Sequence, residues 1–249
     1  MNNQLLNENE RIDQLYALGV KVIQSKKVFS YSIDSVLLAN FPKIPNNKAS
    51  IVDLCAGNGA VGLFVSQKTN CPITQIEIQP ELSDMGQRSI ELNQLTNQMT
   101  MINDDLKNSL NYIKRSSVDL LFCNPPYFKL SESTKQKSNQ HLAIARHELS
   151  TNLDEVLSMS QQLLKTGGHL ALVHRPNRFT EIFDTLRKYK LTPKKIQLVH
   201  PKRNSEANIL LIDAIKDGGE SGIKFLPSLI VHDDAGNYTD ELRTIYFGK

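Results

Sequence analysis

Residues 50–62 indicate the fold most directly; they read Ser50-Ile51-Val52-Asp53-Leu54-Cys55-Ala56-Gly57-Asn58-Gly59-Ala60-Val61-Gly62. A short apolar run rich in β-branched residues leads into a glycine-rich turn, and the turn opens a helical pattern. Glycines tolerate positive φ and let a ligand approach the backbone, while the free N–H groups of the helix N-terminus face that ligand. Gly57, Gly59 and Gly62 also match the dinucleotide-binding spacing G-x-G-x-x-G, so by itself the turn leaves the ligand open.

Beyond this turn, short apolar runs alternate with longer amphipathic stretches. The expected strands cover 50–54, 72–77, 99–102, 118–123, 169–173, 196–199 and 207–212. The expected helices after the glycine turn cover 81–95, 152–164 and 177–189. This alternation predicts a doubly wound α/β fold, in which a mostly parallel sheet of seven strands has helices on both faces and ends in an antiparallel pair.

The two ends of the chain are expected to extend this core of residues 50–215 within the same domain. Residues 1–49 suggest a short hairpin, pairing 16–24 with 25–29, and then a helix that Ser32 caps and that runs to Phe41. Residues 216–249 suggest an extension packed on the core, with short strand candidates around Leu229 and Tyr246.

Composition narrows the class of protein. The net charge is +3, from 29 Lys and Arg against 26 Asp and Glu, which permits nucleic acid as a partner without indicating it. The three cysteines, Cys55, Cys71 and Cys123, have no CxxC spacing, so we expect no disulfide scaffold, no metal and a reducing cytoplasm. No apolar run approaches the ~18 residues of a membrane span, and the polar N-terminus does not read as a signal peptide.

Acidic residues stand at the ends of the first three expected strands: Asp53, Glu77 and Asp105. In a parallel sheet the carboxyl ends of strands meet at one edge, so we expect these carboxylates to face one crevice. Glu77 is placed to bind ribose hydroxyls, Asp105 to accept from an adenine amine, and Asp53 suits an ammonium group. S-adenosyl-L-methionine, a nucleoside with a cationic tail, fits this set; a dinucleotide site or a plain turn with surface carboxylates are the alternatives.

Asn124-Pro125-Pro126-Tyr127 follows the fourth expected strand directly. The prolines remove backbone donors and fix φ, which leaves the Asn124 side-chain oxygen and the Pro125 carbonyl as acceptors. Two rigid acceptors match the two hydrogens of a planar amino group, and Tyr127 offers a ring on which a base or an amide can stack. We therefore predict direct in-line methyl transfer helped by positioning, against the alternative of a turn that only closes a connection.

Together these motifs resemble the Rossmann-like class I methyltransferases that methylate exocyclic amines. Residues 29–39, 145–148, 227–231 and 236–239 are also similar to the bacterial tRNA1(Val) adenine-37 N6-methyltransferase family, so the likeness covers most of the chain. The resemblance implies S-adenosyl-L-methionine as cofactor, RNA and most naturally tRNA as substrate, and a monomeric cytoplasmic enzyme. Cys55 departs from the pattern, since many relatives have glycine there, but a small side chain should fit.

The resemblance also assigns roles to residues of this sequence. The implied cofactor-binding residues are Asp53, Gly57 and Gly59 at the methionine part, Glu77 at the ribose and Asp105 at the adenine. The implied catalytic residues, which would hold the target amine, are Asn124, Pro125 and Tyr127.

Four other functions remain compatible with the motifs. A glutamine-N5 methyltransferase of release factors uses the same loop but carries a longer helical N-terminal domain, for which residues 1–49 leave little room. A guanine-N2 methyltransferase of ribosomal RNA often has phenylalanine in place of Tyr127. DNA adenine methylation would need a target-recognition domain, which is not evident, and a cofactor-binding scaffold would leave the Asn-Pro-Pro-Tyr loop without a use.

Overall fold

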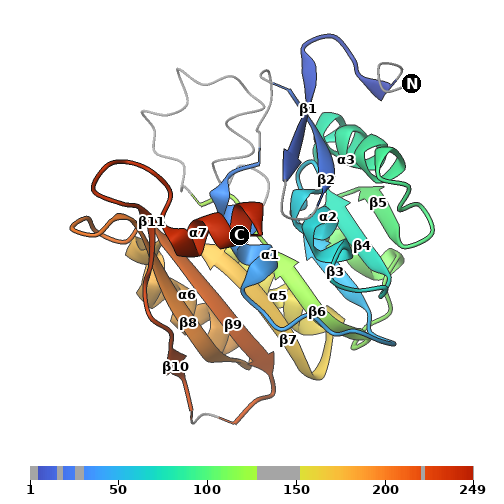
Figure 1. Ribbon diagram of the computed structural model, residues 1–249. Helices are drawn as coiled ribbons and strands as arrows, with labels where there is room; N and C mark the ends of the chain where they lie inside the picture. Colours follow the sequence, from blue (N-terminus) through green and yellow to red (C-terminus); the bar gives the residue numbers. More distant parts are fainter. Residues whose placement is uncertain (1–4, 16–18, 26–30, 128–151, 220–221, 249) are drawn as a thin grey trace, which may run out of the picture.

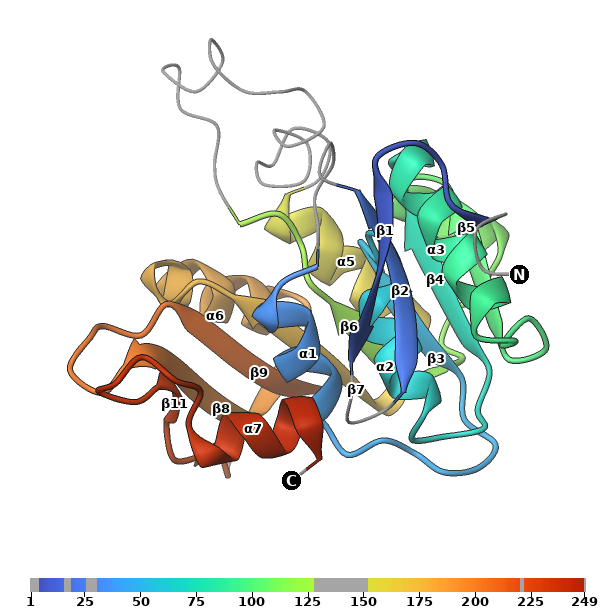
Figure 2. The same ribbon diagram turned by 45° about the horizontal axis from the view of Figure 1, so that its top comes forward.

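The structure is a computed structural model that describes residues 5–15, 19–25, 31–127, 152–219 and 222–248. A central sheet carries helices on both faces, and a separate two-stranded hairpin stands beside helix α3 (Figure 1). The C-terminal helix α7 lies next to α1, whereas the start of the described chain lies beside α3, where Arg88 donates to the Leu5 carbonyl (Figure 2).

The elements follow the sequence in this order. The hairpin strands are β1 (Glu10–Leu15) and β2 (Val20–Ser25). The strands of the sheet are β3 (Ile51–Leu54), β4 (Ile73–Glu77), β5 (Met99–Asn103), β6 (Val118–Cys123), β7 (Leu164–His174), β8 (Leu191–Lys202), β9 (Ile209–Lys216), β10 (Lys224–Phe225) and β11 (Leu229–His232). The helices are α1 (Ile33–Asn40), α2 (Ala60–Ser66), α3 (Pro80–Leu92), α5 (Leu153–Leu163), α6 (Phe179–Lys188) and α7 (Asp240–Phe247), with short 3-10 helices η2 (Leu106–Asn111) and η4 (Pro176–Arg178).

The central sheet has nine strands in the order β10-β8-β9-β7-β6-β3-β4-β5, and β11 also pairs with β8. The pairs among β3 to β7 are parallel, whereas β9 runs antiparallel to both β7 and β8. The expected α/β fold with a mostly parallel sheet is confirmed, but its seven strands are only β3 to β9. The strand candidate around Leu229 is confirmed as β11, but it was not expected to join the central sheet, which it does by pairing with β8. β10 also pairs with β8 and was not predicted, because a strand of two residues leaves no periodicity to detect.

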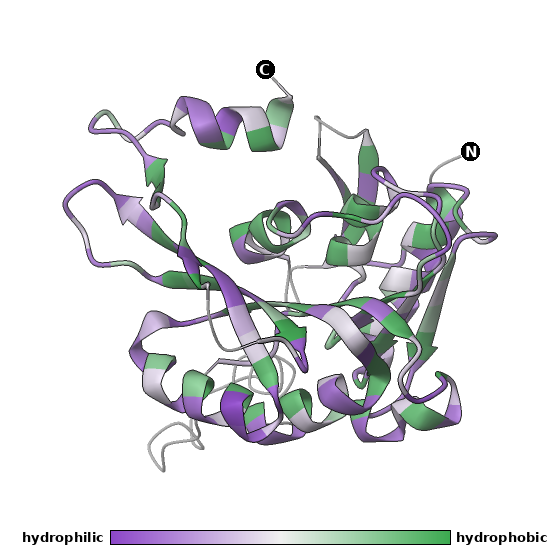
Figure 3. Ribbon diagram, turned by 90° about the horizontal axis from the view of Figure 1, so that it is seen from below, coloured by the Kyte–Doolittle hydropathy of each residue, from purple (hydrophilic) through white to green (hydrophobic). Residues whose placement is uncertain are grey.

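Alternate residues of the central strands enter two separate hydrophobic cores. Ile51 packs with α1 and α2 on one face, while Val52 and Leu54 pack with α5 on the other. This burial on both faces explains why the strands read as continuous apolar runs. Figure 3 shows the same pattern, with largely hydrophobic central strands between helices that mix hydrophobic and hydrophilic residues.

An N-terminal hairpin is present, but its strands are not those of the expected pairing of 16–24 with 25–29, of which residues 16–18 and 26–29 lie outside the described residues. β1 pairs antiparallel with β2, from Glu10 opposite Ser25 to Leu15 opposite Val20. The hairpin is fastened to α3, because Ser89 Oγ accepts from the Ile23 N–H at 2.9 Å. This contact holds β2 against α3, while the polar sequence of β1 gave little local sign of a strand.

Two other expectations need correction. Tyr246 lies in helix α7 and not in a strand, because Thr239 caps this helix and Leu242 anchors it in the core with no exposed surface. Strand β7 begins at Leu164, directly after α5, and so is longer than the expected 169–173. The helices expected from 81, 152 and 177 are confirmed within a few residues, as is the helix that starts after Ser32. In the part of the chain that is described, no helix is long and apolar enough to cross a membrane.

Candidate active site

The glycine-rich turn after β3 follows a path that most side chains would not tolerate. Cys55, Gly57 and Gly59 have φ of +57°, +58° and +80°, all in the left-handed region. A Cβ at Gly59 would lie 3.1 Å from Gln75 Oε1 and 3.2 Å from the Met101 side chain, whereas a Cβ at Gly57 would meet nothing within 4 Å. The positive φ of Gly59 and the tight space beside it both disfavour a side chain there, whereas the space over Gly57 is open to a ligand.

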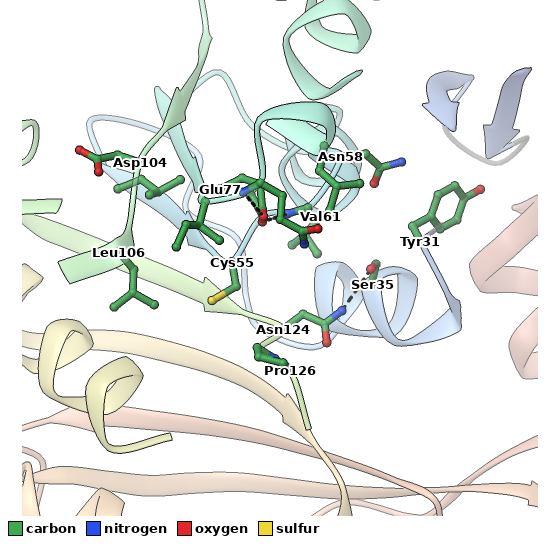
Figure 4. A pocket seen from close by; sticks show the side chains of 16 residues that line it. Tyr31, Ser35, Cys55, Asn58, Val61, Glu77, Asp104, Leu106, Asn124 and Pro126 are labelled. Atoms are coloured by element: carbon green, nitrogen blue, oxygen red, sulfur yellow. Dashed lines mark hydrogen bonds between the residues drawn. The ribbon is translucent and has the colours of Figure 1, made fainter. Parts of the chain in front are cut away.

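A pocket of about 730 Å³, counting its mouth, lies over this turn (Figure 4). Its walls come from α1, the glycine turn and the carboxyl ends of β4, β5 and β6, at the point where the strand order reverses. The lining residues are Tyr31, Ser35, Cys55, Ala56, Gly57, Asn58, Val61, Ile76, Glu77, Ile78, Gln79, Leu82, Asp104, Leu106, Asn124 and Pro126. Of the residues singled out from the sequence, the pocket brings together Gly57, Glu77 and Asn124.

Glu77 stands at the end of β4 with its carboxylate in the pocket wall and only 5% of its surface exposed. Oε2 accepts from the Gly57 N–H at 2.8 Å and Oε1 accepts from the Gln79 N–H at 2.9 Å. Burial raises the pKa of Glu77, and the N–H groups of Gln79 and Gly57 oppose that rise. Each carboxylate oxygen has further acceptor capacity, so this fixed carboxylate can bind two neighbouring hydroxyl groups of a ligand.

Asp53 lies in β3 behind the turn and does not line the pocket. Its Oδ2 accepts from Gln75 Nε2 at 3.1 Å, while its Oδ1 is buried without a hydrogen-bond partner among the described residues. Burial raises the pKa of Asp53 to about 7, and the charge of Glu77 acts in the same direction. Both effects favour the protonated form of Asp53 over the carboxylate.

This buried carboxyl predicts a pH-dependent cost to stability. The folded pKa of about 7 exceeds the ordinary value of 3.8, so the folded state holds the proton more tightly, and stability is lost as pH rises from about 4 through about 7. Asp53→Asn removes the charge while keeping the side-chain shape. We expect its advantage in unfolding free energy over the unmodified protein to grow by on the order of 2–3 kcal/mol between pH 5 and pH 8.

Urea unfolding of both proteins without cofactor, at several pH values, measures this difference. Taking the difference between the two proteins cancels the titration of other groups, such as His174, whose pKa burial lowers to about 3. A difference that stays constant over this pH range would show that Asp53 is ionised throughout.

Asp105 is placed differently from the other two acidic residues. Its side chain caps η2 by accepting from the Lys107 N–H at 2.9 Å, and it does not line the pocket. The preceding residue, Asp104, does line the pocket, but its carboxylate accepts from Asn108 Nδ2, the Tyr112 hydroxyl and the Asp105 N–H, and these contacts lower its pKa. The third strand end thus presents Asp104 to the pocket and turns Asp105 toward the short helix.

The Asn-Pro-Pro-Tyr loop leaves β6 at the pocket mouth, where Asn124 and Pro126 form part of the lining. Asn124 Nδ2 donates to Ser35 Oγ at 3.4 Å, and the Tyr127 hydroxyl contacts both Asn124 Oδ1 and Asp34 Oδ2, the latter at 3.0 Å. Pro125 is buried, Tyr127 is partly buried, and neither lines the pocket. The loop is therefore held by helix α1, whose residues lie about 90 positions earlier in the chain.

Residues at and just after the end of β7 also contact this loop, and the sequence did not indicate that they would. The Arg175 guanidinium lies over one face of the Tyr127 ring at 4.5 Å, His174 meets the ring edge-on, and Arg178 Nη1 donates to the Tyr127 carbonyl at 3.0 Å. Arg175 Nη2 also lies 3.3 Å from Asp34 Oδ2. One sequence signal could have pointed to these contacts: the mostly polar residues 174–178 follow an apolar strand. Glu77 was singled out because it also stands at the end of a strand. Residues 128–151, which include 145–148, lie outside the described residues.

Solved structures with the same fold place the chain in a class. A predicted O-methyltransferase from Agrobacterium tumefaciens superposes with a TM-score of 0.67 at 22% sequence identity, covering 86% of this chain and 96% of that one. A Pyrococcus horikoshii TYW2 structure in complex with MeSAdo superposes with a TM-score of 0.59 at 14% identity, over 85% and 73% of the two chains. The fold is that of the class I Rossmann-like methyltransferases.

Within that class, the chain belongs to the family described as Methyltransferase small domain, whose model matches residues 19–191. It is a methyltransferase that uses S-adenosyl-L-methionine. Two similar curated proteins are named tRNA1(Val) (adenine(37)-N6)-methyltransferase. The one from Flavobacterium psychrophilum is 27% identical over 88% of this chain and 92% of its own length. The one from Shewanella loihica is 27% identical over 85% and 88%.

Proposed function

We propose that this protein transfers a methyl group from S-adenosyl-L-methionine to N6 of adenosine 37 in tRNA1(Val), as a monomer in the cytoplasm. The observation that carries the proposal is the Asn-Pro-Pro-Tyr loop at the end of β6, which opens on the same pocket as the glycine turn and Glu77. The two curated relatives described above, both named for this reaction, match 88% and 85% of the chain, with nearly equal coverage of their own lengths. RNA is therefore the substrate class that the chain's relatives support.

The pocket residues fit the cofactor. A Cβ at Gly57 would occupy the open space over the turn, which is where the methionine part would lie, with Gly59 supporting the turn from beneath. Glu77 would accept from the two ribose hydroxyls, and the η2 start at Asp105, with Asp104 beside it, would border the adenine. Asp53 would act from behind the turn through its unpartnered oxygen, favouring the cationic end of the ligand.

Asn124 and Pro125 would hold the acceptor amine. The prolines that follow Asn124 restrict the backbone, so Asn124 Oδ1 and the Pro125 carbonyl stay fixed when the amine donates to them. Donation from both N–H groups raises electron density on the nitrogen and orients its lone pair toward the methyl group that the sulfonium cofactor supplies. Tyr127 borders this site, and since Arg175 covers one face of its ring, a stacked base would use the other face.

The proton released after transfer has no strong base beside it in the described site. Burial and the nearby Arg178 lower the pKa of His174 to about 3, and its Nδ1 already accepts from the Arg175 N–H at 2.8 Å. Asn124 and the Pro125 carbonyl accept hydrogen bonds but do not take up a proton near neutral pH. Asp34, the nearest carboxylate, contacts the Tyr127 hydroxyl and does not line the pocket, so the proton would leave to water and the residues would assist mainly by positioning.

Mass mapping of modified nucleosides in tRNA1(Val), from cells with and without the gene, tests the proposed function. We expect N6-methyladenosine at position 37 to disappear in the deletion and to return when the purified protein and S-adenosyl-L-methionine are added to that tRNA. An unchanged tRNA together with loss of a methylated guanine or of a methylated release-factor glutamine would instead assign one of the other acceptors.

A further inference from the structure

Two residues of helix α1 reach the loop that would hold the acceptor amine. Asp34 and Ser35 are adjacent, at the first turn of α1, and both are nearly fully buried, at 4% and 5% exposure. Ser35 Oγ lies 3.4 Å from Asn124 Nδ2, and Asp34 Oδ2 lies 3.0 Å from the Tyr127 hydroxyl. Helix α1 therefore touches both side chains of the loop through polar contacts.

The Asn124 amide is oriented with its Nδ2 toward Ser35 Oγ. Its Oδ1 then faces the Tyr127 hydroxyl. Oδ1 is the only acceptor on this side chain, and it is the atom that the acceptor amine needs. Any other donor that occupies Oδ1 competes with the amine.

Tyr127 is such a competitor. Its hydroxyl has one proton and lies within reach of two acceptors, Asn124 Oδ1 and Asp34 Oδ2. Asp34 forms an ion pair with Arg175 at 3.3 Å, and a hydrogen bond to a carboxylate is roughly twice as strong as one to a neutral amide oxygen. The hydroxyl proton therefore favours Asp34.

From this arrangement we infer that Asp34 is a positioning residue for methyl transfer: by accepting the hydrogen bond of the Tyr127 hydroxyl, it leaves Asn124 Oδ1 free for the acceptor amine. The inference rests on the proposed transfer to an exocyclic amine and adds a residue to that site. Without Asp34, the Tyr127 hydroxyl donates to Asn124 and blocks it. Tyr127→Phe removes the hydroxyl that would occupy Asn124 Oδ1 when Asp34 is absent. We therefore expect Tyr127→Phe to compensate for the loss of Asp34.

A double-mutant cycle tests this directly. We expect Asp34→Ala to lower kcat about tenfold or more, which corresponds to losing one hydrogen bond to a charged group, with the Kd for cofactor changed less than about twofold. Tyr127→Phe alone should lower kcat by only about two- to fivefold. The double variant should match Tyr127→Phe and so be more active than Asp34→Ala. Asp34→Asn, which keeps a weaker neutral acceptor, should lose less, and Tyr127→Phe should cancel that loss as well.

A purely structural role for Asp34 predicts the opposite result, because the two losses would add and the double variant would be the least active. That outcome overturns the inference. Asp184→Ala, on the exposed side of α6, serves as the matched control and should leave kcat unchanged. If Asp34→Ala does not fold, Asp34→Asn is compared with and without Tyr127→Phe in its place. A double variant less active than Asp34→Asn again overturns the inference.

The cycle also separates this inference from the proposed function. If the unsubstituted protein methylates an acceptor other than adenosine 37, the proposed function fails, and the cycle is run on that amine. If it methylates adenosine 37 but Tyr127→Phe does not restore Asp34→Ala or Asp34→Asn, only the inference fails.

Discussion

Asn124→Ala is expected to lower kcat for methyl transfer by about a thousandfold while the Kd for S-adenosyl-L-methionine changes less than about twofold. Loss of Oδ1 leaves the acceptor amine held by one oxygen only, free to rotate away from the line of attack, and removing one such fixed polar contact typically costs ~10²–10³ in rate. Cofactor affinity should persist because the Asn124 side chain bonds to Ser35 and Tyr127, and not to Glu77 or the glycine turn.

Single-turnover kinetics on the tRNA substrate and calorimetric titration with S-adenosyl-L-homocysteine measure these two quantities separately. Asn70→Ala is the matched control, since Asn70 is exposed in the loop that precedes β4, at the opposite edge of the sheet. Near-normal turnover by Asn124→Ala would mean that the amine is held elsewhere, and the role given to the whole Asn-Pro-Pro-Tyr loop would be wrong.

Glu77→Ala should show the reverse pattern, with the cofactor Kd raised about a hundredfold. Its carboxylate would accept from two ribose hydroxyls, and hydrogen bonds to a charged group contribute about 1.5–3 kcal/mol each, with 1.4 kcal/mol corresponding to tenfold in affinity. The substitution also leaves the Gly57 and Gln79 N–H groups without their acceptor, which loosens the turn that forms the floor of the pocket. At saturating cofactor, kcat should recover to within about tenfold.

Glu77→Gln provides a gentler comparison because it preserves volume but turns one acceptor oxygen into a donor that faces a backbone N–H. We expect it to raise the Kd about tenfold. Glu91→Ala, an exposed position of the neighbouring stretch of α3, should leave the Kd unchanged. If titration showed that Glu77→Ala bound cofactor as well as Glu91→Ala, the ribose would have to be bound by another group.

Much of the fold could be predicted because its strands and helices show a clear local periodicity of hydrophobic residues. Strands buried on both faces must be continuously apolar, so β3 to β9 were recognisable from runs of four to six residues, and α3, α5 and α6 from their amphipathic spacing. The pairing of the β1–β2 hairpin was not recognisable in this way, because the hairpin packs against distant residues, as in the contact of Ile23 with Ser89. The helix at 240–247 was missed although it carries a local sign, since Thr239 caps its start.

The candidate site could also be predicted only in part from the sequence. The parallel sheet guarantees that residues at strand ends share one edge, so Gly57, Glu77 and Asn124 could be expected in one pocket from their positions alone, as the structure shows. It could not be foreseen that Asp53 lies behind the turn or that Asp104 faces the pocket in place of Asp105, because side-chain direction depends on packing with Gln75 and on the cap of η2.

By itself, then, the sequence determined the α/β architecture, the edge of the sheet where ligands bind and the residue types that meet there, since these follow from hydrophobic periodicity and strand direction. Tertiary structure alone decided which side chains support that edge. Asp34, Tyr127 and Arg175 lie 93 and 141 positions apart along the chain, counted from Asp34, and only the packing of α1 against the ends of β6 and β7 brings their charges and hydrogen bonds together.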